Sequence, residues 1–150
     1  MHSPVSEPST PQIVVIEDNP ADVRMVREGI DATDIEVAVT VINSGRQAAE
    51  QLTAIEADRP EKHPDLILLD LNLPGKSGFD LLELIREETA FPDVPVVVVS
   101  SSENREDINR VYEQSANAYV MKPADPDDYI RMIDATVDFW IATATPSTND

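Results

Sequence analysis

Five short runs of apolar residues, rich in valine, isoleucine and leucine, recur along the chain. Most of them are apolar at nearly every position rather than at alternate positions. This pattern is typical of strands in a parallel sheet that is covered on both faces. We therefore expect five strands, at residues 12–16, 35–42, 65–70, 94–99 and 118–121.

Between these runs, apolar residues recur every three to four positions, which is typical of helices with one buried side. Asn19 and Pro20 favour a helix start after the first strand. Ser44 and Gln47 form a capping box before the second helix. The last helix is expected to begin near Asp125. Five strands that alternate with five helices predict an α/β fold, a three-layer sandwich around a five-stranded parallel sheet.

The chain has 150 residues, which suits one domain. We expect that domain at residues 12–142, with a flexible tail at 1–11, a C-terminal tail at 143–150 and no output domain. The lack of cysteine excludes disulfides, a thiol nucleophile and cysteine-ligated metals. No apolar run approaches the roughly 20 residues that span a bilayer, and the N-terminus is unlike a signal peptide. We therefore expect a cytoplasmic protein without membrane insertion.

Acidic side chains dominate the charge of the chain. There are 29 acidic and 11 basic residues, which gives a formal net charge of −18. Such a surface repels phosphate backbones, so direct nucleic-acid binding is not expected. Lysine occurs only at Lys62, Lys76 and Lys122. An acidic, lysine-poor composition indicates a salt-loving organism, in which concentrated salt screens the self-repulsion.

Polar residues follow four of the five expected strands. Glu17 and Asp18 end the first, Asp70 the third, Ser100 the fourth and Lys122 the fifth. Sites in parallel α/β sheets lie beyond these carboxyl ends. Three carboxylates at one edge require a cation, and Mg²⁺ suits them because it takes oxygen ligands and keeps several waters. With a lysine and a hydroxyl nearby, the set fits a carboxylate nucleophile that accepts a phosphoryl group.

These five residues, with Pro123 after the lysine, resemble the response regulator receiver domain of two-component signalling. The resemblance covers about residues 12–142 and implies the flavodoxin-like receiver fold. Residues 69–78 and 117–123 are most similar to single-domain regulators that pair with phytochrome-type sensor kinases.

The resemblance implies a role for each residue of the site. Asp70 would accept the phosphoryl group from a phosphohistidine of a sensor histidine kinase. Lys122 would pair with the Asp70 carboxylate and then with the phosphoryl group. Mg²⁺ would be held by Glu17, Asp18, Asp70 and the backbone carbonyl of Asn72.

Two residues would carry the conformational switch. Ser100 would move toward the phosphoryl oxygen, and Tyr119 would rotate inward behind it, although a strand tyrosine can also be a half-buried packing residue. The peptide bond before Pro123 is expected to be cis. Ser100 stands where threonine is usual, Ser101 where a smaller residue is often found, and Ala124 where many receivers have phenylalanine.

The sequence thus predicts a phosphorylation switch that signals by binding an unidentified downstream protein, and not a multiple-turnover enzyme. A homodimer through the apolar last helix, a phosphate sink and a phosphate-independent pseudo-receiver stay open. A phosphatase of the haloacid-dehalogenase type would need an acid where Asn72 stands. A nucleotide- or flavin-binding module would need a glycine-rich loop after the first strand, and this chain has carboxylates there.

Overall fold

The computed structural model describes residues 10–142, and the sheet at its centre has the order β2-β1-β3-β4-β5 with every pairing parallel. The strands are β1 (Gln12–Ile16), β2 (Ala38–Ile42), β3 (Leu66–Leu69), β4 (Val96–Ser100) and β5 (Ala118–Met121). The α/β class and the five parallel strands predicted from the sequence are confirmed. The predicted C-terminal tail, and the N-terminal tail up to residue 9, lie outside the described residues.

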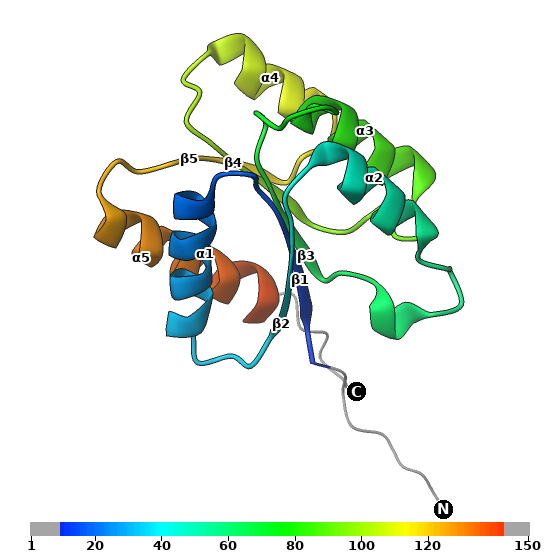
Figure 1. The fold of residues 1–150 in the computed structure, drawn as a ribbon, viewed down its shortest axis with the longest axis horizontal. Helices are drawn as coiled ribbons and strands as arrows, with labels where there is room; N and C mark the ends of the chain where they lie inside the picture. The colour runs from blue at the N-terminus through cyan, green and yellow to red at the C-terminus, as the bar shows by residue number, and fades with distance from the viewer. Residues whose placement is uncertain (1–9, 143–150) are drawn as a thin grey trace, which may run out of the picture.

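Five helices cover the two faces of the sheet. They are α1 (Pro20–Ala32), α2 (Gly45–Ala54), α3 (Gly78–Glu88), α4 (Arg105–Glu113) and α5 (Pro126–Val137). Figure 1 shows α1 and α5 together on one side of the sheet and α2, α3 and α4 on the other. A 3₁₀ turn at Pro60–Lys62 precedes β3, and a π-helical turn at Asp138–Ala142 follows α5.

The alternation of side chains along each strand builds two separate cores. Ile13 and Val15 of β1 face α1 and α5, and they pack in one cluster with Ile133. Val14 and Ile16 face the opposite way, into the cluster beneath α2, α3 and α4. Each strand therefore fills both layers, which explains why its sequence is apolar at nearly every position.

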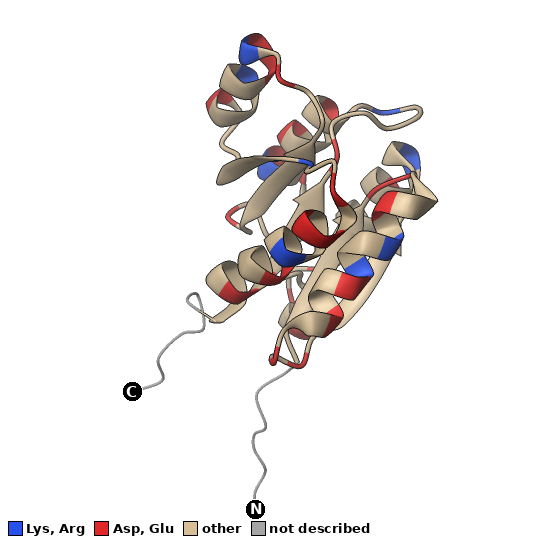
Figure 2. Ribbon diagram, turned by 90° about the vertical axis from the view of Figure 1, so that its left-hand side faces the viewer, with Lys and Arg blue, Asp and Glu red and all other residues tan. Residues whose placement is uncertain are grey.

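The N-caps predicted for α1 and α2 are present. The Asn19 side chain accepts hydrogen bonds from the N–H groups of Ala21 and Asp22, and Ser44 accepts one from Gln47. These caps fix the start of each helix just beyond a strand end. Acidic residues outnumber basic ones in the chain. Figure 2 shows the acidic positions along the helices and their connecting loops. Within residues 10–142, no helix is both long and apolar enough to cross a membrane.

Candidate functional site

The two central strands bring the carboxylates together. Ile16 of β1 lies opposite Leu69 of β3, so the next residues, Glu17 and Asp70, leave the sheet side by side. The Asp70 N–H donates to the Ile16 carbonyl at 3.0 Å, which ties the two strand ends together. Because β2 lies on the far side of β1, the chain changes direction across the sheet here. Open parallel sheets bind ligands in the crevice at this point.

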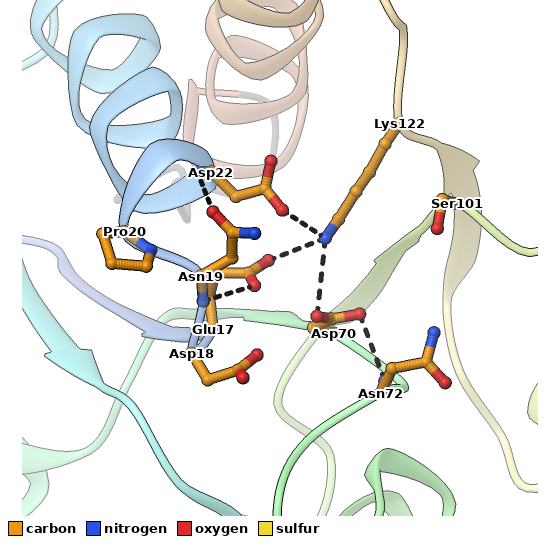
Figure 3. Close-up of a pocket in the computed structure, with 9 residues that line it drawn as sticks. All are labelled: Glu17, Asp18, Asn19, Pro20, Asp22, Asp70, Asn72, Ser101 and Lys122. Carbon is orange, nitrogen blue, oxygen red and sulfur yellow. Dashed lines mark hydrogen bonds and ion pairs between the residues drawn. The ribbon is translucent and has the colours of Figure 1, made fainter.

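A pocket lies in this crevice, as Figure 3 shows. It is lined by Glu17, Asp18, Asn19, Pro20, Asp22, Asp70, Asn72, Ser101 and Lys122. Five of the seven site residues predicted from the sequence are in this set, and the two that are not are Ser100 and Tyr119.

Three carboxylates of the pocket are arranged as a metal site requires. Glu17, Asp18 and Asp70 each offer an oxygen, and these oxygens all lie within 4.8 Å of one another. Glu17 and Asp70 are buried, whereas Asp18 is exposed. Hard divalent cations take such oxygen ligands and complete their shell with water, which the exposed side can supply. The residues present therefore fit a divalent cation.

Asn72 lies beside the acceptor carboxylate. Its backbone N–H donates to Asp70 Oδ1 at 3.2 Å, and its side chain is exposed at the pocket. This hydrogen bond orients the Asp70 carboxylate toward the crevice. The role of the Asn72 carbonyl as a metal ligand stays a prediction.

Lys122 reaches into the acidic cluster from the end of β5. Its Nζ lies 3.0 Å from Glu17 Oε1, 2.8 Å from Asp22 Oδ2 and 3.4 Å from Asp70 Oδ2. The Lys122 side chain is only 12 % exposed, so these contacts are poorly screened by water. The amine is thus shared among three carboxylates (Figure 3).

The electrostatics of the pocket favour a cation. Burial, then the Asp70 charge, raises the pKa of Glu17 to about 7 despite its ion pair with Lys122. Burial opposes the charge on Lys122, but the hydrogen bonds that the amine donates to Asp22 and Glu17, with the charges of Glu17 and Asp70, outweigh this effect and raise the pKa of the amine. Counting Asp18, the pocket holds four carboxylates and one amine, which leaves an excess of three negative charges when all are ionised. A divalent ion would relieve this repulsion.

Ser100 and Tyr119 lie behind the pocket rather than on its wall. Ser100 is buried, and its Oγ accepts a hydrogen bond from the Ser102 N–H at 3.2 Å. The Tyr119 hydroxyl donates to the Ser102 carbonyl at 2.6 Å, and its ring is packed against the core beneath α2, α3 and α4. Both predicted switch residues therefore contact the same loop after β4, while the exposed Ser101 lines the pocket.

Two features differ from the sequence analysis. The peptide bond between Lys122 and Pro123 is trans, as are the other peptide bonds in residues 10–142, so the expected cis bond is not present. With this trans peptide the Lys122 amine already reaches its three carboxylate partners. Sequence reasoning also missed Asp22, the closest of those partners. Its signal was its place in the first turn after the Asn19 cap, where helical side chains point back toward the strand end.

Comparisons with known proteins agree with this geometry. The model of the family described as response regulator receiver domain matches residues 13–134. The chain is 33% identical to the response regulator Rcp1 of Synechocystis sp. over 143 residues, which covers 94% of this chain and 97% of that protein.

Solved structures show the same relationship. The phosphorylated cyanobacterial phytochrome response regulator RcpA superimposes with a TM-score of 0.83 at 34% identity, covering 92% of this chain and 99% of that one. The Mn²⁺-bound form of Rcp1 superimposes with a TM-score of 0.81 at 32% identity and the same coverage. The chain therefore belongs to the response regulator receiver domain family, whose members interact with sensor histidine kinases and act as signalling switches rather than as multiple-turnover enzymes.

Proposed function

We propose that Asp70 is the phosphoryl acceptor of this receiver and that Mg²⁺ is its metal. The observation that carries the proposal is the meeting of three carboxylates and one lysine at the β1–β3 crevice, with the Asp70 carboxylate buried beside Lys122. A buried carboxylate in this setting has its negative charge balanced by nearby cations, so it can approach an anionic phosphoryl group.

In the proposed reaction, an Asp70 oxygen forms a bond to phosphorus as the phosphorus–nitrogen bond of a phosphohistidine breaks. The electron pair of that bond stays on the ring nitrogen of the histidine, which takes a proton from solvent to give neutral imidazole. Mg²⁺ would be held by Glu17, Asp18, Asp70 and the Asn72 carbonyl, and it would offset the charge of the transferring group. Lys122 would balance charge on the other side.

Ser100 and Tyr119 would report the phosphorylated state. Within the described residues, the Ser100 hydroxyl accepts one hydrogen bond and donates none, so its proton is available to a phosphoryl oxygen. A movement of Ser100 would pull on Ser102, whose carbonyl accepts the Tyr119 hydroxyl. The loop after β4 therefore connects the pocket to β5.

We propose that the output surface is formed by α4, β5 and α5. Tyr112 of α4 and Met121 of β5 are exposed large apolar residues on these elements. Such side chains suit a protein partner, either an unidentified downstream protein or a second copy of this chain. Since RcpA is named as a phytochrome response regulator, we propose a phytochrome-type histidine kinase as the phosphoryl donor.

The test of phosphoryl acceptance is intact-mass spectrometry with a small acyl-phosphate donor and Mg²⁺. The wild-type protein should gain one phosphoryl group, Asp70→Asn should gain none, and Asp80→Asn, which removes an exposed acid at the start of α3, should still gain it. No gain by the wild type, under conditions that label a known receiver, would overturn the proposal. Partner binding that survives Asp70→Asn would instead favour a phosphate-independent pseudo-receiver.

The acidic surface supports a further proposal about working conditions. With a net charge of −18 and three lysines, we propose that the protein is adapted to concentrated salt. Its unfolding temperature should rise steeply with KCl as repulsion is screened. A flat salt dependence would contradict this. The cytoplasmic location expected from the sequence stays a prediction.

A further inference from the structure

We propose that Asp22 is a positioning residue for Lys122, which holds the lysine amine when Glu17 and Asp70 turn their oxygens to the divalent cation. The inference rests on the proposed metal site and adds a residue to it. It follows from the contacts that the Lys122 amine makes with three different carboxylates, which Figure 3 shows.

Asp22 makes the shortest of the three contacts. The Lys122 Nζ is 2.8 Å from Asp22 Oδ2, compared with 3.4 Å from Asp70 Oδ2. The remaining partner, Glu17 at 3.0 Å, belongs to the group of oxygens that could hold a metal, as does Asp70. Asp22 does not belong to that group. Among the partners of Lys122 in the described residues, Asp22 is therefore the one whose carboxylate a bound metal would leave to the amine.

Lys122 and a divalent cation compete for the same oxygens. The amine now contacts Glu17 and Asp70, so metal binding must either move it or place two cations side by side. A carboxylate outside the metal group gives the amine a place to remain, close to the phosphoryl acceptor. Without Asp22, the amine would rely on Glu17 and Asp70 alone, and the metal would bind more weakly.

The protein holds Asp22 in a fixed position. The Asp22 N–H donates to the Asn19 side chain at 3.2 Å, so the residue is part of the capped first turn of α1. Its carboxylate is 18 % exposed and lies within electrostatic range of the Tyr129 hydroxyl of α5, which is buried. The Asp22–Lys122 pair therefore lies against the α1–α5 layer, where water screens it little.

The test measures divalent cation affinity by calorimetric titration with Mn²⁺ and Mg²⁺. Asp22→Asn should weaken binding about tenfold relative to wild type. The control is Asp80→Asn, because Asp80 occupies the same third position of α3, with its N–H bonded to the Ser77 cap, and is not among the residues that line the pocket. This control should stay within about twofold of wild type.

A double-mutant cycle separates positioning from simple loss of charge. In a Lys122→Gln background there is no amine to hold, so adding Asp22→Asn should cost less than about threefold. Asp22→Glu keeps a carboxylate and should recover most of the affinity. Equal losses in both backgrounds, or an Asp22→Asn variant that matches Asp80→Asn, would overturn the inference.

The two proposals fail in different ways. If the wild type binds neither metal at millimolar concentration, the metal site itself is wrong, and this inference is overturned with it. If the wild type binds metal but Asp22→Asn binds it equally well, only the positioning role is overturned. Thermal unfolding without metal should show that each variant is folded before its affinity is compared.

Discussion

Gly78 packs directly against the backbone of Asp70. A Cβ at Gly78 would lie 2.5 Å from the Asp70 carbonyl oxygen and 2.6 Å from Leu71 Cα. The Gly78 N–H also donates to the Leu71 carbonyl at 3.0 Å, so the start of α3 is fastened to the segment that carries the phosphoryl acceptor. The position of the Asp70 carboxylate thus depends on the absence of a side chain eight residues later.

Gly78→Ala should therefore destabilise the protein by about 2 kcal/mol or more, because the atoms that it would strike are backbone and cannot turn away. Urea unfolding of the metal-free protein measures this. Gly75→Ala is the control, since Gly75 has a φ of +80° but nothing within 4 Å of a Cβ. This variant should be destabilised only by the strain of holding an alanine in the left-handed conformation, about 1 kcal/mol. Equal losses in the two variants would contradict the packing argument.

Glu17 should make the metal-free protein less stable as pH rises. Its pKa of about 7 in the folded protein, raised from 4.5 by burial and the Asp70 charge, means that the folded state keeps a proton that the unfolded state has released. Stability should thus fall between about pH 4.5 and pH 7, and this group should add no further change above that range. Urea unfolding in EDTA across this range should show the slope.

The matched variants isolate this carboxyl group. Glu17→Gln should flatten the slope, because the amide cannot ionise, whereas Glu83→Gln, at an exposed position of α3, should leave it unchanged. A Glu17→Gln variant with the wild-type slope would show that another group carries the pH dependence.

Lys122→Gln should destabilise the metal-free protein by about 3 kcal/mol, because it leaves the buried carboxylates of Glu17 and Asp70 without their cation. Excess Mg²⁺ should restore much of that loss and should raise the unfolding midpoint more than in wild type. Lys62→Gln, at an exposed lysine, is the control and should change little. If Lys122→Gln were as stable as this control without metal, the Lys122 amine would not be offsetting the negative charge of the carboxylates.

The strand ends could be predicted from sequence because local pattern and parallel register determine them together. Once residues 12–16 and 65–70 are recognised as buried strands, Glu17 and Asp70 must leave the sheet on the same edge. The strand predicted at 35–42 pairs only from Ala38. Its one neighbour in the sheet is β1, and Ala38 lies opposite Gln12, the first residue of β1, so the residues before Ala38 have no strand to pair with. Ile35 and Val37 are apolar because they pack against the core without joining the ladder.

Contacts between distant elements could not be predicted in this way. The Asp22–Lys122 pair spans 100 residues and depends on how α1 sits beside the end of β5. Arg86 is similar: its guanidinium donates to the carbonyls of Pro92, Val94 and Ser115, although no local pattern in the sequence marks those acceptors. Periodicity shows which side of a helix is buried, but not which polar groups it will meet.

Tyr129→Phe should stabilise the protein. The Tyr129 side chain is buried in the α1–α5 layer, and its hydroxyl has no hydrogen-bond partner among residues 10–142. Burial also raises the pKa of this hydroxyl above its usual value, so it stays neutral. A buried hydroxyl without a partner loses its hydration and gains nothing in return, so its removal should stabilise the fold by about 1 kcal/mol. Calorimetry should show an unfolding temperature higher by about 3 to 5 °C.

Tyr119→Phe is the matched control and should change stability in the opposite direction, because the Tyr119 hydroxyl donates to the Ser102 carbonyl at 2.6 Å. A Tyr129→Phe variant that is less stable than wild type would show that this hydroxyl is bonded in solution.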